Sequence, residues 1–169
     1  MRIGSKLIIF CLVCLSSLRL SAQDGRNALF SLPPFERAVL CIKHFESLHS
    51  WKDYPYVGYG HQLLPGERFT AAMTERQADS LLRADLIKRF ASFQRFGKDA
   101  LLLTVLSYNI GEYRLLGSGR RPKCRLVRKL ESGDRDIYRE YVSFCRYKGK
   151  VLRGLVKRRK VEFALFYVP

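Results

Sequence analysis

The chain has 169 residues, of which 47% are hydrophobic and 27% are charged. This length fits one domain, and this composition excludes a disordered chain and a small disulfide-dense scaffold. Lysine and arginine number 31 against 15 aspartate and glutamate residues, and the resulting net charge of +16 indicates an anionic partner.

The N-terminal segment has the composition of a secretory signal peptide. A basic start precedes an apolar run over residues 7–15, and small residues at 21–22 offer a cleavage point. The alternative is a single anchoring helix, but the run is well short of the roughly 20 apolar residues that span a bilayer. We therefore expect a signal peptide at 1–22 and a folded domain at 23–169. That domain keeps a net charge of +13, because the signal segment carries three basic residues and no acidic ones.

Helical periodicity begins after the Pro33-Pro34 pair and predicts an amphipathic helix over residues 35–48. Residues 51–64 mix aromatic residues with glycine and proline, which predicts short strands and turns. Thr74 and Gln77 have the spacing of a capping box and begin a helix that extends towards Gly97.

The sequence predicts that the second half of the chain is mostly helical. Residues 99–110 are apolar on nearly all sides, which predicts a central buried helix ending at Gly111. Capping and glycine signals predict three further helices at 122–132, 135–147 and 152–167. We expect an α+β fold in which helices dominate and one small sheet lies near the N-terminus.

Neither cysteine nor histidine spacing indicates a metal site. Residues 23–169 contain Cys41, Cys124 and Cys145, an odd number with scattered spacing. We expect buried apolar thiols, and the sequence leaves a disulfide between Cys124 and Cys145 open. His61 has no second ligand at metal spacing, so a structural hydrogen bond is the favoured role.

Glu46 is the first candidate for chemistry. It lies in the last turn of a predicted helix, and Phe45 and Trp51 are its neighbours in sequence. A helix C-terminus and apolar surroundings both disfavour an ionised carboxyl group, which suits a general acid. The alternative is a surface glutamate paired with Lys43 or Arg37, and position alone does not decide between them.

Four sequence segments extend this hypothesis. They are Phe45 to His61, which ends in Gly58-Tyr59-Gly60-His61, then Ser107 to Gly111, Leu126 to Asp134, and Lys148 to Glu162. Together and in this order they resemble the phage-type lysozymes, glycoside hydrolase family 24. The chain also resembles, less specifically, lysozyme-like proteins of bacterial conjugative transposons. The similarity spans roughly residues 35–167.

The resemblance implies a lysozyme-like fold with a small N-terminal β-sheet lobe and a helical C-terminal lobe. It also implies a muramidase that hydrolyses the β-1,4 bond between N-acetylmuramic acid and N-acetylglucosamine, without a cofactor or metal. Glu46 falls on the general acid of the family. We expect peptidoglycan glycan strands as the partner, a secreted or periplasmic monomer, and no membrane association after signal cleavage.

The second catalytic group is not defined by the resemblance. In the family, Asp or Cys follows the acid by nine residues and Thr by fifteen, but here Pro55 and His61 occupy those positions. Asp53 is a candidate base, because inverting hydrolysis tolerates a carboxyl separation of about 6.5 to 9.5 Å. Alternatively His49, His61 or Tyr56 positions the water, or catalysis is weakened.

Further residues are candidates for substrate binding or support. They are Tyr56, Tyr59, His61, Tyr108, Asn109, Arg158 and Arg159. Tyr108 and Asn109 suit sugar stacking and acetamide hydrogen bonds, although core packing and helix capping explain them nearly as well. Arg158 or Arg159 could pair with Glu46, as the family's C-terminal arginine does, or could belong to a solvated basic face.

Two other functions compete with hydrolysis. Basic runs at 120–129 and 157–160 are compatible with nucleic-acid binding, but expected export and the lack of a recognised nucleic-acid motif disfavour it. We therefore expect no nucleic-acid partner. The stronger alternative is a catalytically weak or inactive lysozyme-like protein that binds cell walls.

Overall fold

The computed structural model describes Gly25 and residues 27–169, so the expected signal peptide at 1–22 lies outside the described residues. The chain divides into a unit of residues 1–33 and a larger compact unit, Pro34–Pro169. All elements below belong to the larger unit. Within the described residues, none of the helices combines the length and apolar character needed to cross a membrane.

The first helix and the small sheet form the N-terminal part of this unit. Helix α2 spans Pro34–Glu46 and ends there because Ser47 adopts a left-handed φ of 58°. The predicted end at residue 48 is therefore two residues too late. A short 3-10 turn, η1 (Trp51–Asp53), precedes strands β1 (Tyr56–Val57) and β2 (His61–Gln62).

The two strands form the small sheet expected from the sequence. They pair antiparallel, with Tyr56 opposite Gln62 and Val57 opposite His61. Gly58 and Gly60 lie in the connecting turn with φ values of 58° and 94°, a conformation that glycine adopts at little cost.

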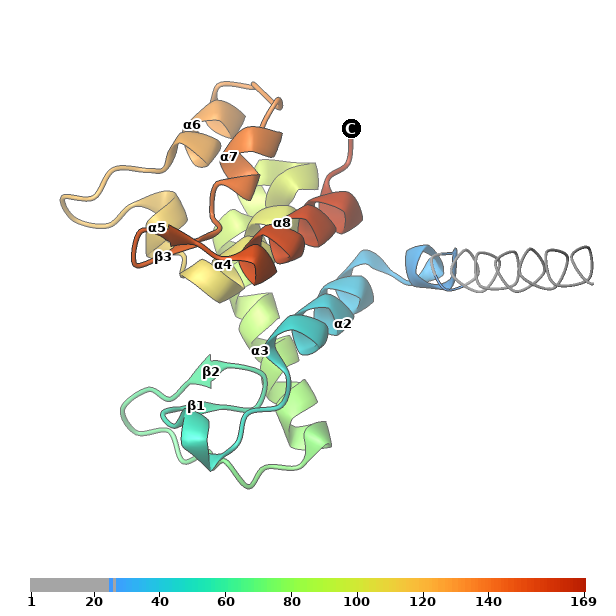
Figure 1. The fold of residues 1–169 in the computed structure, drawn as a ribbon, viewed down its shortest axis with the longest axis vertical. Helices are drawn as coiled ribbons and strands as arrows, with labels where there is room; N and C mark the ends of the chain where they lie inside the picture. The colour runs from blue at the N-terminus through green and yellow to red at the C-terminus, as the bar shows by residue number, and fades with distance from the viewer. Residues whose placement is uncertain (1–24, 26) are drawn as a thin grey trace, which may run out of the picture. The chain divides into compact units, whose positions relative to one another are not determined.

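Helix α3 (Glu75–Phe93) begins at the predicted capping box. Thr74 Oγ1 accepts from the Gln77 amide at 3.3 Å, and Gln77 Oε1 accepts from the Thr74 amide at 2.8 Å. Figure 1 shows α3 in green, extending from the β1–β2 region to the helices of the second half. A 3-10 segment, η2 (Gln94–Asp99), then leads into the next helix.

Helix α4 (Ala100–Ile110) is the central helix of the fold, as predicted. Most of its side chains are buried, and it packs against α2, α3 and the last helix, α8 (Arg153–Phe166). Gly111 ends α4 with a φ of 85°. The remaining elements are α5 (Tyr113–Leu116), α6 (Arg125–Glu131), α7 (Tyr138–Val142), β3 (Arg146–Tyr147) and β4 (Lys150–Val151).

The helix predicted at 122–132 is α6, and it starts at Arg125, three residues after the predicted start. The Cys124 amide donates to the Leu115 carbonyl oxygen at 3.0 Å, and Cys124 itself is extended, with φ −67° and ψ 162°. This bond ties the segment before α6 to α5. The proline signal at 122 therefore does not mark the first helical turn.

The helix predicted at 135–147 is also wrong over most of its length. Asp134 Oδ1 accepts from the Asp136 amide at 2.9 Å, which makes a local turn, and α7 covers only five residues. Strands β3 and β4 follow as an antiparallel hairpin, with Lys148 and Gly149 both at positive φ between them. The second half of the chain thus contains a second, unexpected hairpin.

The three described cysteines are free thiols, so the structure contains no bond between Cys124 and Cys145. Cys41 lies in the core on α2, where burial raises the pKa of its thiol to about 12. An apolar structural role for Cys41 agrees with the expectation from the sequence.

Candidate active site

Glu46 is held at the end of α2 by an ion pair with α8. Its Oε1 atom accepts from Arg158 Nη1 at 2.6 Å, although 112 residues separate the two in sequence. The side chain of Glu46 is 19% exposed and that of Arg158 only 5%. Of the two alternatives for the basic run, the structure therefore supports pairing by Arg158 over a solvated face.

A buried carboxylate organises the arginines behind Glu46. Glu162 Oε1 accepts from Arg158 Nε at 2.8 Å, and Glu162 Oε2 lies 3.3 Å from Arg159 Nε. Tyr141 adds its hydroxyl, which donates to Glu162 Oε2 at 3.0 Å. Burial raises the pKa of Glu162, although both arginines act in the opposite direction.

Asn109 is connected to the same network. Its Oδ1 atom accepts from Arg159 Nη2 at 2.8 Å, so Arg159 fixes the orientation of this amide at the end of α4. Burial lowers the pKa of Arg159, and the charge of Glu162 opposes that effect. Besides the shared Glu162, Arg158 and Arg159 thus have different partners, a carboxylate on α2 and an amide on α4.

The candidate tyrosines contribute mainly to packing. The hydroxyl of Tyr108 donates to the Tyr59 carbonyl oxygen at 3.0 Å, which links α4 to the β1–β2 turn, and burial raises the pKa of Tyr108. Tyr59 is 6% exposed and donates its own hydroxyl to Glu75 Oε1 at 3.1 Å. Tyr56, by contrast, is 43% exposed on β1 and is open to a ligand.

Asp53 forms hydrogen bonds within its own turn, to Ser50. Its Oδ2 atom accepts from the Ser50 amide at 2.7 Å and from the Ser50 hydroxyl at 3.1 Å, which completes a capping box around η1. These hydrogen bonds hold the pKa of Asp53 below its usual value. The carboxylate is exposed and ionised, as a base requires, but part of its acceptor capacity is used within its own turn.

Both ring nitrogens of His61 have a carboxylate partner. Its Nδ1 atom lies 2.8 Å from Asp85 Oδ2 on α3, and its Nε2 atom lies 2.9 Å from Glu67 Oε2. Burial alone would lower the pKa of His61, but these two carboxylates outweigh it and raise the pKa. This is the structural role favoured from the sequence, and both ring nitrogens are occupied.

His49 is the alternative water-positioning residue that the fold brings beside the acid. A Cβ atom on Gly60 would lie 3.7 Å from Glu46 Oε2 and also 3.7 Å from His49 Cε1, so both side chains flank this glycine. The His49 amide donates to the Gly58 carbonyl oxygen at 2.7 Å. Its buried Nδ1 atom has no hydrogen-bond partner among the described residues.

Sequence reasoning missed the roles of four residues in these networks. They are Glu67, Asp85, Tyr141 and Glu162. Only Glu162 had a usable signal, because its spacing of three and four residues from two arginines places all three on one helix face. Asp85 and Tyr141 lie more than 20 residues from their partners, and Glu67 lies six residues after His61 without a recognisable spacing motif.

Comparison with known proteins agrees with the mostly helical, lysozyme-like fold. A solved structure, the muramidase domain of SpmX from Asticaccaulis excentricus, is 26% identical to the chain. The match has a TM-score of 0.61 and covers 78% of this chain and 95% of that one. No functionally curated protein matches the chain. The phage lysozyme family matches residues 43–162, a segment that contains both Glu46 and Arg158, and the chain therefore belongs to the phage lysozyme family.

Proposed function

We propose that the protein is a muramidase that hydrolyses the β-1,4 bond between N-acetylmuramic acid and N-acetylglucosamine in peptidoglycan. The observation that carries this proposal is the Glu46–Arg158 pair, a partly exposed carboxyl group backed by a buried guanidinium at 2.6 Å. The expected net charge of +13 for residues 23–169 supports the choice of an acidic polymer as substrate.

Glu46 acts as the general acid in this proposal. It protonates the leaving glycosidic oxygen and becomes a carboxylate as the bond breaks. Arg158 Nη1 already lies within hydrogen-bond distance of Glu46 Oε1 and stabilises that negative charge. Glu162 holds Arg158 in place from the opposite side.

The attacking water requires a second group, for which Asp53 and His49 are the candidates. Asp53 supplies an ionised carboxylate, whereas His49 lies beside Gly60 next to the acid. Water activated on the face opposite the leaving group gives a product with inverted anomeric configuration. NMR of the first sugar released by the wild type tests this stereochemistry.

Glu46→Gln tests the proposal most directly. Glutamine keeps the shape of the side chain but cannot donate the proton, so release of reducing sugar should fall by about 10² to 10⁴-fold. Glu131→Gln is the matched control, because Glu131 pairs with Arg95 and Lys123 on the surface, and should keep full activity. Equal rates for Glu46→Gln and the wild type would contradict the proposal.

A second candidate function is binding of cell walls without hydrolysis. The specific observation in its favour is the use of Asp53 as a cap for its own turn, together with Pro55 and His61 at the family's water-positioning places. Wild-type protein that sediments with peptidoglycan but releases no reducing sugar would establish this function.

We also propose that the protein acts outside the cytoplasm, after removal of residues 1–22. The basic start and the apolar run of that segment support this localisation. Intact-mass measurement of the protein from the cell envelope and medium tests it, and a mature N-terminus near Gln23 is expected.

A further inference from the structure

A pocket of about 750 Å³ opens in the C-terminal lobe, and Glu46 does not line it. Its lining carries six basic side chains and no acidic one. The six are Arg114, Arg121, Lys123, Arg125, Arg128 and Arg146. Such a concentration of one charge around a concave surface attracts anions.

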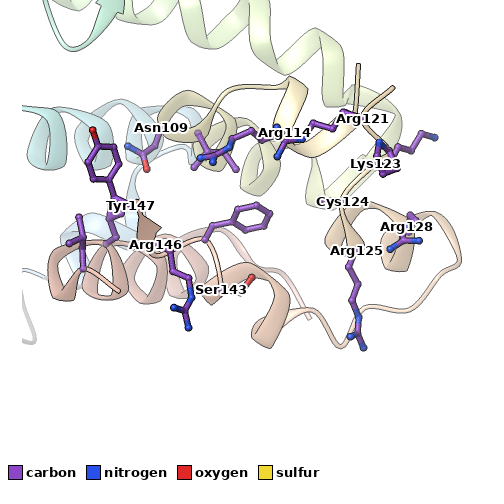
Figure 2. A pocket seen from close by; sticks show the side chains of 15 residues that line it. Asn109, Arg114, Arg121, Lys123, Cys124, Arg125, Arg128, Ser143, Arg146 and Tyr147 are labelled. Carbon is purple, nitrogen blue, oxygen red and sulfur yellow. The ribbon is translucent and has the colours of Figure 1, made fainter. Parts of the chain in front are cut away.

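The basic side chains come from three separate parts of the chain. Figure 2 shows Arg114 and Arg121 from α5 and the turn after it, Lys123, Arg125 and Arg128 from the α6 segment, and Arg146 from β3. The cluster is therefore a product of the tertiary fold. The β3–β4 hairpin and the extended segment before α6, both unexpected from the sequence, place these residues in the lining of one pocket.

Most of these charges are not neutralised by the protein. Arg125 lies 3.1 Å from Glu140, and Lys123 lies 2.7 Å from Glu131. The other four arginines form no ion pair with any residue of the described chain. Those four are Arg114, Arg121, Arg128 and Arg146, of which Arg121 stacks on Tyr113 and Arg146 donates to the Gly149 carbonyl oxygen.

We propose that this pocket is a binding site for phosphate groups. Arginine donates through a planar fork that matches phosphate oxygens. A terminal phosphate offers three acceptors and up to two negative charges, and each phosphodiester of a polymer offers two acceptors and one negative charge. A single carboxylate would neutralise only one of the four unpaired arginines, whereas a terminal phosphate or two successive phosphodiesters would neutralise two. Phosphate is therefore the oxyanion class that fits this charge best.

The pocket also has an apolar part. Phe144, Leu152 and Leu155 line it beside the charged groups. These side chains offer a surface for the carbon units between the phosphates of a phosphodiester polymer. Free phosphate would use the arginines alone, so the two sources of phosphate can be distinguished by affinity.

Calorimetric titration of the full chain tests the site. The probes are inorganic phosphate, pyrophosphate and poly(glycerol phosphate), with acetate at matched ionic strength as the carboxylate reference. We expect saturable binding of a phosphate probe that weakens by about tenfold or more in Arg114→Gln/Arg128→Gln. Both arginines are exposed, so the variant should fold normally.

Arg139→Gln/Lys160→Gln is the matched control. It removes the same two charges from exposed positions outside the pocket, and its affinity should stay within about twofold of the wild type. Tighter binding of poly(glycerol phosphate) than of both small ions identifies a polymer as the source, and equal or weaker binding identifies free phosphate. Equal losses in the two double variants, equal binding of acetate, or no saturable binding of any phosphate probe would overturn the proposal.

Discussion

The two halves of the candidate active site are held by different kinds of contact. Glu46 is bonded to Arg158, which lies 112 residues away and is almost fully buried. Asp53 is bonded to Ser50, three residues before it, and both are exposed. The acid therefore depends on the assembled core, whereas the candidate base depends on one turn.

This difference has an energetic consequence. Arg158, Arg159 and Glu162 are at most 4% exposed, so each of these charges depends on its partners to offset the loss of water. Asp53 faces solvent, and water can replace its hydrogen bonds at little cost. We therefore expect substitutions in the buried network behind Glu46 to lower the free energy of unfolding strongly, and substitutions of Asp53 to change it little.

The largest effect is expected from Glu162→Gln. Removing this charge leaves Arg158 and Arg159 buried without their shared carboxylate, so the free energy of unfolding should fall by about 3 to 5 kcal/mol. Urea unfolding monitored by circular dichroism measures it. Hydrolysis measured below the unfolding transition should also fall, because Arg158 loses the carboxylate that holds it in place against Glu46.

The matched control for this prediction is Glu131→Gln, which removes a surface carboxylate paired with Arg95 and Lys123. Its free energy of unfolding should stay within about 0.5 kcal/mol of the wild type. Similar stabilities of the two variants would show that the buried network is not required for the fold.

The same distinction explains which parts of the structure could be predicted. The start of α3 depends on Thr74 and Gln77, three residues apart, and the β1–β2 turn depends on Gly58 and Gly60. Local signals of this kind are present in the sequence itself.

Features set by distant contacts could not be predicted. The start of α6 is controlled by a hydrogen bond from Cys124 to Leu115, which has no sequence signature. Arg158 and Arg159 are adjacent on one helix, and only packing against α2 and α4 decides which of them meets Glu46. The β3–β4 turn uses Lys148 at positive φ, where glycine or asparagine would have been the recognisable signal.

An intermediate and pH-dependent effect is expected from His61→Gln. Loss of the bonds to Asp85 and Glu67 should lower the free energy of unfolding by about 1 to 3 kcal/mol at pH 5. The folded-state pKa of His61 is raised, so its charge-dependent contribution is fully present below the unfolded value of about 6.5. It is lost as the pH rises through the folded-state pKa.

Urea unfolding between pH 5 and pH 9 measures this trend. The difference between wild type and His61→Gln should shrink towards high pH. His44→Gln is the control, because His44 is exposed on α2 and no carboxylate pairs with it in the described chain. A difference for His61→Gln that is constant over the whole range would show that His61 contributes only as a neutral ring.

The smallest effect on stability is expected from Asp53→Asn. A loss of activity in this variant would therefore report on the role of Asp53 in catalysis and not on unfolding. The side-chain amide keeps an oxygen acceptor for Ser50, and the site is exposed, so thermal unfolding should be close to that of the wild type. If Asp53 activates water, hydrolysis of peptidoglycan should nevertheless fall by about 10² to 10⁴-fold. A loss below threefold, combined with a large loss in His49→Ala, would instead assign water positioning to the histidine that flanks Gly60 beside Glu46.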